Sequence, residues 1–158
     1  MYSDQADFDL RCEWGLHGLH ATTGAIDAIV IVDVLSFSTA VDVAVSNGAI
    51  VLPYRWQDES APGFARQQGA VLASGRHPGQ YSLSPASLRS VPAGTLLVLP
   101  SPNGSTLSLS TRGIPTFTAC LRNARSVAGR VKRHGKRIAL FRPGSDGPMA
   151  HSGRAWKT

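Results

Sequence analysis

The stretch Ala28-Ile29-Val30-Ile31-Val32-Asp33 sets the fold class of this chain of 158 residues. Five consecutive aliphatic residues, four of them β-branched, are typical of a strand that is buried on both faces. From Ser38 the pattern changes, and apolar residues recur at helical spacing until Asn47-Gly48, which supplies a stop signal. Ser36 or Ser38 can cap the start of this helix. The stretch therefore predicts a β–α unit.

The alternation of strands and helices continues outward on both sides of this unit. Residues 74–85 are rich in Gly, Pro and Ser and predict a loop. The order of elements predicts an α/β protein, with a three-layer α/β/α architecture and a parallel or mixed central sheet. The expected strands are 8–14, 28–32, 50–54, 71–73, 95–99, 115–119 and 137–141, and the expected helices are 38–46, 59–68, 105–110 and 123–134.

The composition is that of an ordinary globular domain, with 42% hydrophobic and 16% charged residues. No apolar run approaches the roughly 20 residues that span a bilayer, and we expect no membrane partner. Residues 1–9 contain three aspartates and no apolar segment, so we expect no signal peptide. Cys12 and Cys120 form no disulfide framework or zinc spacing, which favours a cytoplasmic location.

The charge is distributed unevenly along the chain. Residues 1–120 carry six arginines and nine acidic residues, a net charge of −3, whereas residues 121–158 carry ten basic residues and one acid, a net charge of +9. This basic segment suggests an alternative function, a module that binds nucleic acid or an acidic partner through residues 121–158. No aromatic residues interleave the basic cluster 130–137 for base stacking, so a solvated helix face is the favoured interpretation and nucleic acid is not the expected partner.

Three turns follow predicted strands, at 33–39, 101–106 and 120–125. Ligands of open α/β sheets bind beyond the carboxyl ends of the strands, and free backbone N–H groups at helix starts suit phosphate. Asp33 adds a hard oxygen ligand for Mg²⁺. Each feature also has a purely structural interpretation, as a helix cap or a plain turn. The candidate phosphate-binding residues are Ser36, Ser38, Thr39, Asn103, Gly104 and Ser105.

The segment His17-Gly18-Leu19-His20 is a weaker candidate for a metal site. It lacks both a glutamate and the helical spacing with which two histidines bind zinc from one helix face. We therefore expect no metal site there.

Several segments resemble signature segments of the 2-phosphosulfolactate phosphatase family. The most specific are Asp33-Val34-Leu35-Ser36-Phe37-Ser38-Thr39, Asn103-Gly104-Ser105 and Asn123-Ala124, and further matches keep the same order from about residue 9 to residue 140. The resemblance implies a three-layer α/β/α fold and Mg²⁺-dependent hydrolysis of 2-phospho-3-sulfolactate to sulfolactate and phosphate, a step of coenzyme M biosynthesis. On this basis we expect a phosphoric monoester hydrolase with a small phosphate ester as its ligand, and a homo-oligomer is compatible with it.

The resemblance also implies roles for individual residues. Asp33 would hold Mg²⁺, either as the nucleophile of an aspartyl-phosphate or beside a metal-bound water, and Asn123 would position substrate or water. Family members often have Arg-Ala where this chain has Ser36-Phe37, which removes a cation that faces the phosphate. Arg122 or Arg125 would then supply that cation. Around Ser74-Gly75-Arg76 the family usually has Gly-Glu-Arg, so an acidic group is missing.

The family continues beyond the point at which residue 141 would fall, with a segment such as Pro-Ala-Gly-Glu-Arg-Trp. One back-translation of residues 141–158, shifted by two nucleotides, encodes that segment. Our hypothesis is therefore a frameshift near Phe141: residues 1–141 would form an incomplete domain, and residues 142–158 a disordered aberrant tail. We expect the strand at 137–141 to be left as an uncovered sheet edge. The missing segment would have supplied acidic groups for the metal, so its loss would impair activity.

Overall fold

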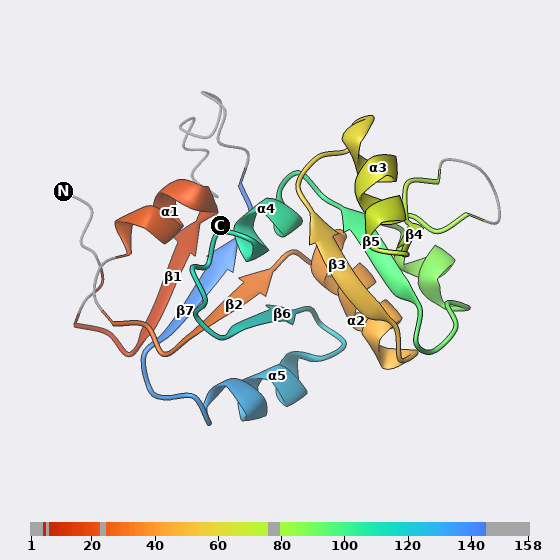
Figure 1. The fold of residues 1–158 in the computed structure, drawn as a ribbon. Coiled ribbons are helices and arrows are strands. Elements are labelled where there is room, and N and C mark those ends of the chain that lie inside the picture. The colour runs from red at the N-terminus through yellow and green to blue at the C-terminus, as the bar shows by residue number, and fades with distance from the viewer. Residues whose placement is uncertain (1–4, 6, 23–24, 76–79, 145–158) are drawn as a thin grey trace, which may run out of the picture.

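The computed structural model describes residues 5, 7–22, 25–75 and 80–144, in which helices alternate with strands of two parallel sheets (Figure 1). The first sheet has the strand order β1-β7-β2-β6 and the second has the order β3-β5-β4. The α/β class is confirmed, although the strands form two sheets where one was expected. The strands are β1 (Leu10–Trp14), β2 (Ala28–Val32), β3 (Ile50–Tyr54), β4 (Val71–Leu72), β5 (Leu96–Pro100), β6 (Thr116–Ala119) and β7 (Ile138–Arg142).

The helices differ from the expectation at two places. The segment containing His17 and His20 forms a helix that was not predicted, and a short 3₁₀ helix ends the long loop before β5. Gly18 is needed in the first of these helices because a Cβ there would lie 2.7 Å from the Cβ of Glu13. The helices are α1 (Gly15–Ala21), α2 (Phe37–Ser46), α3 (Ser60–Gln67), η1 (Pro85–Leu88), α4 (Gly104–Ser108) and α5 (Ala124–Val131).

One face of the first sheet is fully packed. Ile29, Ile31 and Phe141 are completely buried there, together with Leu107 of α4 and the partly buried leucines of α1. Burying a side chain of this size stabilises a fold by about 1.5–3 kcal/mol relative to leaving it exposed. This face therefore supplies much of the core beneath the carboxyl edge of the sheet.

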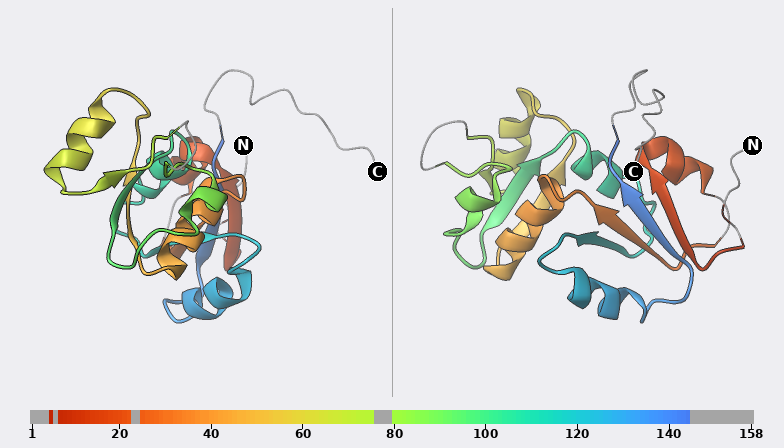
Figure 2. Two further views of the ribbon diagram at one scale, coloured as in Figure 1. Left: turned by 90° about the vertical axis from the view of Figure 1, so that its right-hand side faces the viewer. Right: turned by 180° about the vertical axis from the view of Figure 1, so that it is seen from behind.

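The opposite face is covered only in part. Helix α5 packs Val127 and Val131 against the β2 and β6 side of the sheet (Figure 2). Over β1 and β7 the same face carries an open strip, which we define as Leu10, Cys12, Trp14 and Leu140. Leu10 and Trp14 are 63% and 55% exposed. The part of the first sheet that no described helix covers is therefore a portion of one face, over β1 and β7.

Strand β7 lies in the interior of the first sheet, where it pairs with β1 on one side and β2 on the other. The expectation that this strand would form an uncovered edge is wrong, because the sheet edges are β1 and β6. Arg142 belongs to β7, so it is part of the domain and not of the expected tail. Residues 145–158 of that expected tail lie outside the described residues.

The start of β7 is held to the start of β2 by Asp27. Its Oδ2 accepts hydrogen bonds from the backbone N–H groups of Lys136 and Arg137, and its Oδ1 accepts one from the Arg137 guanidinium at 2.8 Å. These bonds, the side-chain one foremost, lower the pKa of Asp27 to about 2. A lowered carboxyl pKa means that the ionised form stabilises this junction.

Helix α2 lies between the two sheets, in contact with β6 of the first and β3 of the second. Its buried face, which includes Phe37, Ala40 and Ala44, joins Leu88 of η1 and the buried leucines of β5 in one core cluster. Helix α3 contacts β4 and β5. None of the helices in the described part of the chain combines the length and the apolar character needed to cross a membrane.

Candidate functional site

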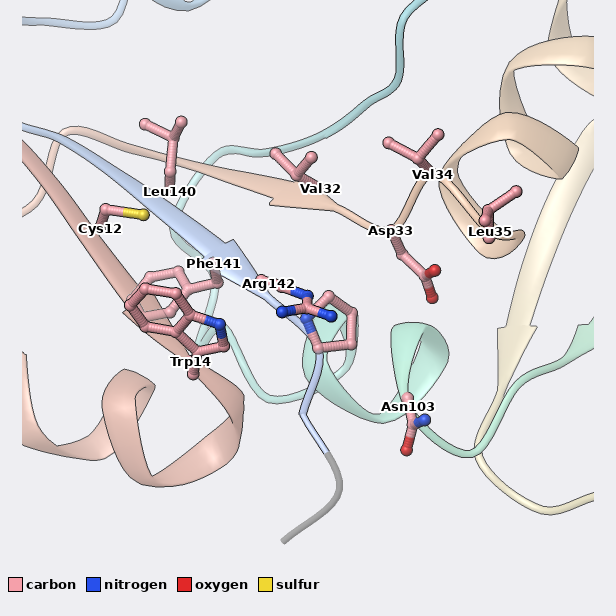
Figure 3. A pocket seen from close by; sticks show the side chains of 11 residues that line it. Cys12, Trp14, Val32, Asp33, Val34, Leu35, Asn103, Leu140, Phe141 and Arg142 are labelled. Atoms are coloured by element: carbon pink, nitrogen blue, oxygen red, sulfur yellow. The ribbon is translucent and has the colours of Figure 1, made fainter. Parts of the chain in front are cut away.

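A pocket of about 640 Å³ opens at the carboxyl edge of the first sheet, where β1, β2 and β7 end beside the turn before α4. Asp33 and Asn103, which are seventy positions apart in the chain, both line it. Figure 3 shows the Asp33 carboxylate projecting from the end of β2 into the space between the Asn103 turn and the Arg142 guanidinium. The remaining lining residues are Cys12, Trp14, Val32, Val34, Leu35, Leu140, Phe141 and Pro143.

Asp33 is the acidic group of this pocket, and its surroundings alter its acidity. Partial burial raises the pKa of its carboxyl group, against the opposing effects of a hydrogen bond from the Phe37 backbone N–H and of the charge on Arg142. A carboxylate with a raised pKa is a better proton acceptor than a solvated one. An ionised carboxylate has two acceptor oxygens, so Asp33 retains acceptor capacity for a ligand beside the Phe37 backbone.

The hydroxyl groups of the β2–α2 turn do not line the pocket. Ser38 is completely buried, and its Oγ donates to the Ile31 carbonyl and accepts from the Asp33 N–H, both at 3.0 Å. Thr39 Oγ1 donates to the Val34 carbonyl at 2.7 Å. Ser36 is the N-cap residue of α2, but its side chain makes no capping bond. The Ser38 and Thr39 hydroxyls hold the backbone that carries Asp33, and no phosphate-facing role follows from the placement of any of the three.

In the β5–α4 turn, too, one residue lines the pocket and the others bond the backbone of the turn. Asn103 is exposed and lines the pocket, whereas Ser105 is completely buried and donates to the Leu99 carbonyl at 3.0 Å. The Gly104 N–H is taken by Ser101 Oγ at 3.1 Å. Glycine is required at this position, since a Cβ would lie 2.3 Å from the Phe37 ring. Of the three residues predicted here, only Asn103 lines the pocket.

The β6–α5 turn lies outside this pocket. Asn123 bonds its own turn, accepting from the Cys120 N–H at 2.8 Å and donating to the Thr118 carbonyl at 3.1 Å. Arg122 forms an ion pair with Asp42 of α2 at 2.8 Å, and Arg125 is exposed on α5. The structure therefore does not bring Asn123, Arg122 or Arg125 together with Asp33.

Arg142 is a pocket residue that sequence reasoning missed. It was assigned to the expected tail, although it directly follows the apolar run Ile138–Phe141 in the same way that Asp33 follows Val32. Paired in register with Trp14 at the carboxyl end of β1, it supplies a guanidinium beside Asp33. A polar residue that ends a buried strand was the available signal.

One side chain of the pocket, the Asp33 carboxylate, is of the kind that binds Mg²⁺, which commonly takes one or two carboxylates together with substrate phosphate and water. Figure 3 shows the Asn103 amide directed away from this carboxylate. The described residues include no group of three or more His, Cys, Asp or Glu side chains that would hold a metal ion by themselves. His17 and His20 of α1 accordingly take part in no such group.

A groove of about 420 Å³ lies between α5 and the first sheet. Apart from Lys132 at its margin, the side chains that line it are apolar or, in Cys120, a thiol. The groove and the pocket that contains Asp33, which we call the acid pocket, share Val32, Val34 and Leu140, so they lie next to each other on one face of the sheet.

No protein-family model matches this chain, and no curated protein matches it significantly.

Proposed function

We propose that the chain binds and hydrolyses a small phosphate monoester at the acid pocket. The observation that supports this most directly is the meeting of Asp33, Asn103 and Arg142 at the carboxyl edge of a parallel sheet, where α/β proteins bind their ligands. The family resemblance makes 2-phospho-3-sulfolactate the first substrate to test and Mg²⁺ the expected cofactor. Other small phosphate esters are the second.

Each residue of the pocket has a distinct task in this proposal. The Arg142 guanidinium binds non-bridging phosphate oxygens, and the Asn103 amide donates a further hydrogen bond. Asp33 lies where it either attacks phosphorus or accepts the proton of an attacking water. When bound together with the ester, Mg²⁺ would offset the negative charge that gathers on the phosphate.

Release of inorganic phosphate, measured with Mg²⁺ and with EDTA, tests the proposal. We expect release from 2-phospho-3-sulfolactate or from a member of a panel of small phosphate esters, its dependence on Mg²⁺, and its loss in Asp33→Ala. The matched control is Asp42→Ala, which removes an aspartate whose partner is the exposed Arg122. Full activity of Asp33→Ala would remove Asp33 from the mechanism.

The basic segment supports a second candidate function, binding of a polyanion. Arg125, Arg130, Lys132 and Arg133 are exposed on α5 and the residues after it, and no acidic residue occurs between positions 121 and 144. Arg122 and Arg137 are less available, because both form ion pairs.

Retention on heparin at increasing salt concentration tests this second function. Replacing the Arg130, Lys132 and Arg133 side chains by glutamine should shift elution to clearly lower salt if these cations bind the polyanion, since each phosphate or sulfate contact adds to the salt dependence. The control is the double variant Arg55→Gln and Arg66→Gln, whose positions are far from α5 in the sequence. Unchanged elution of the triple variant would exclude this function for α5.

A further inference from the structure

Asp33 and Asn103 lie on one side of the acid pocket and Cys12 and Trp14 on the other, with the Arg142 guanidinium between them (Figure 3). Among the described residues that line the pocket, Arg142 is the only cation. One guanidinium suits the phosphate of a monoester. A second strongly anionic group on the same ligand, such as a sulfonate, would find no cationic partner among them, so this lining favours the other small phosphate esters of the proposed function over 2-phospho-3-sulfolactate.

Three residues of the open strip, Cys12, Trp14 and Leu140, line the rest of the pocket. Trp14 is 55% exposed. Cys12 lies two residues before it on β1 and is paired in register with Leu140 of β7. Figure 3 shows the indole ring and the Cys12 thiol on the side of the pocket away from Asp33. Water in contact with such a wall is readily displaced by an apolar group of a ligand, at a gain of about 25 cal/mol per Å² buried.

Part of the apolar lining belongs to the groove beneath α5 as well. Val32, Val34 and Leu140 line both cavities, so a ligand anchored at Arg142 can extend along them over the sheet.

From this lining we infer that the site takes phosphate monoesters that carry a bulky apolar group, with the phosphate at Arg142 and the apolar group along Val34 and Leu140 toward the groove. This inference rests on the proposed phosphate site and specifies its substrate class. It assigns the open strip, which no element of the described chain covers, to ligand binding.

Calorimetric titration of the full-length chain with methyl-, butyl- and hexylphosphonate in the presence of Mg²⁺ tests the inference. These probes carry a phosphate-like head and cannot be hydrolysed, so the readout does not depend on turnover. We expect affinity to rise roughly fourfold for each added methylene that is buried. Val34→Thr, which keeps the shape of the side chain, should weaken hexylphosphonate about tenfold and leave methylphosphonate unchanged.

Trp14→Ser provides a second variant, which removes an exposed side chain and leaves the core intact. It should also reduce the gain with chain length, whereas the control Val45→Thr, an exposed valine outside both cavities, should not. If methylphosphonate binds but chain length has no effect, the inference fails and the phosphate site stands. If no phosphonate binds, the proposed function fails with it.

Discussion

The β2–α2 and β5–α4 units are built alike and differ in one functional respect. In each, a completely buried serine, Ser38 or Ser105, donates to a carbonyl of the preceding strand at 3.0 Å. The residue just after the strand differs: Ser101 accepts a hydrogen bond from the first N–H of α4 at 3.1 Å, whereas the Phe37 backbone at the start of α2 only lowers the pKa of the Asp33 carboxyl. The hydroxyl of Ser101 is used within its own turn, whereas the carboxylate of Asp33 has a second oxygen that can meet a ligand. The same position thus serves structure alone in one unit and can serve chemistry in the other.

Replacing Asp33 by serine, the residue at the matching position of the β5–α4 unit, should have the largest effect on phosphate release. Asp33→Ser retains an oxygen at this position and removes the charged group, so we expect phosphate release to fall about 10²- to 10⁴-fold, the usual contribution of a positioned acid or base. Asn103→Ala should cost about tenfold, as expected for one hydrogen bond to a charged ligand. Steady-state kcat/KM for both variants checks the order, and equal losses would contradict the distinct role of Asp33.

The buried serines should show the next largest effect, on stability. Ser38→Ala leaves both the Ile31 carbonyl and the Asp33 N–H without their side-chain partner, whereas Ser105→Ala affects the Leu99 carbonyl. We expect each to lower the free energy of unfolding by about 1–3 kcal/mol, and Ser38→Ala to lower it more.

Urea denaturation measures these losses, with Ser46→Ala at the exposed end of α2 as the control. The control should change the unfolding free energy by less than about 0.5 kcal/mol. A larger loss for Ser105→Ala than for Ser38→Ala would show that the two units are not held in the same way.

The smallest effect concerns the pH dependence of stability. Burial raises the pKa of Asp33 above 3.8, so the folded state binds its proton more tightly than the unfolded state does. Stability due to this group therefore falls as the pH rises through the interval between 3.8 and the raised folded value, and stays reduced above it.

Asp33→Asn should consequently be more stable than the parent chain at neutral pH, and this difference should vanish below pH 3.8. Melting temperatures measured from neutral to acidic pH check the trend. Asn103→Ala is the control, because its effect on the melting temperature should not change across this pH interval. A neutral-pH loss of stability in Asp33→Asn would show that the carboxylate is needed for folding.

Sequence periodicity located most elements because it reports burial directly. The bounds of β2 and β3 match the predicted strands, since each is an apolar run closed by a polar residue or a turn. Helix α1 was missed because its glycines and histidines have no helical pattern, and close packing of Gly18 on Glu13 decides its shape. Which strands pair is not encoded in periodicity, so the division into two sheets and the central place of β7 could not be predicted.

The sequence predicted that Asp33 and Asn103 lie at one edge of the sheet. Asp33 and Asn103 do share a pocket, because the carboxyl ends of parallel strands and the helix starts that follow them gather at one edge. The hydroxyl residues were chosen by type, and type does not tell whether an oxygen faces a ligand or its own backbone, as Ser38 and Asn123 illustrate. Arg142 was missed because the end of the last strand was placed one residue too early.

The position of β7 also bears on how the chain assembles during synthesis. β1 pairs with no strand other than β7 in the described part of the chain, and β7 is the last strand of that part to leave the ribosome. The β3-β5-β4 sheet is complete well before then, so it can form first, while β1 waits for a partner that is made last. Nascent chains that stop before residue 138 should therefore protect β3 and β5 from proteolysis and leave β1 accessible.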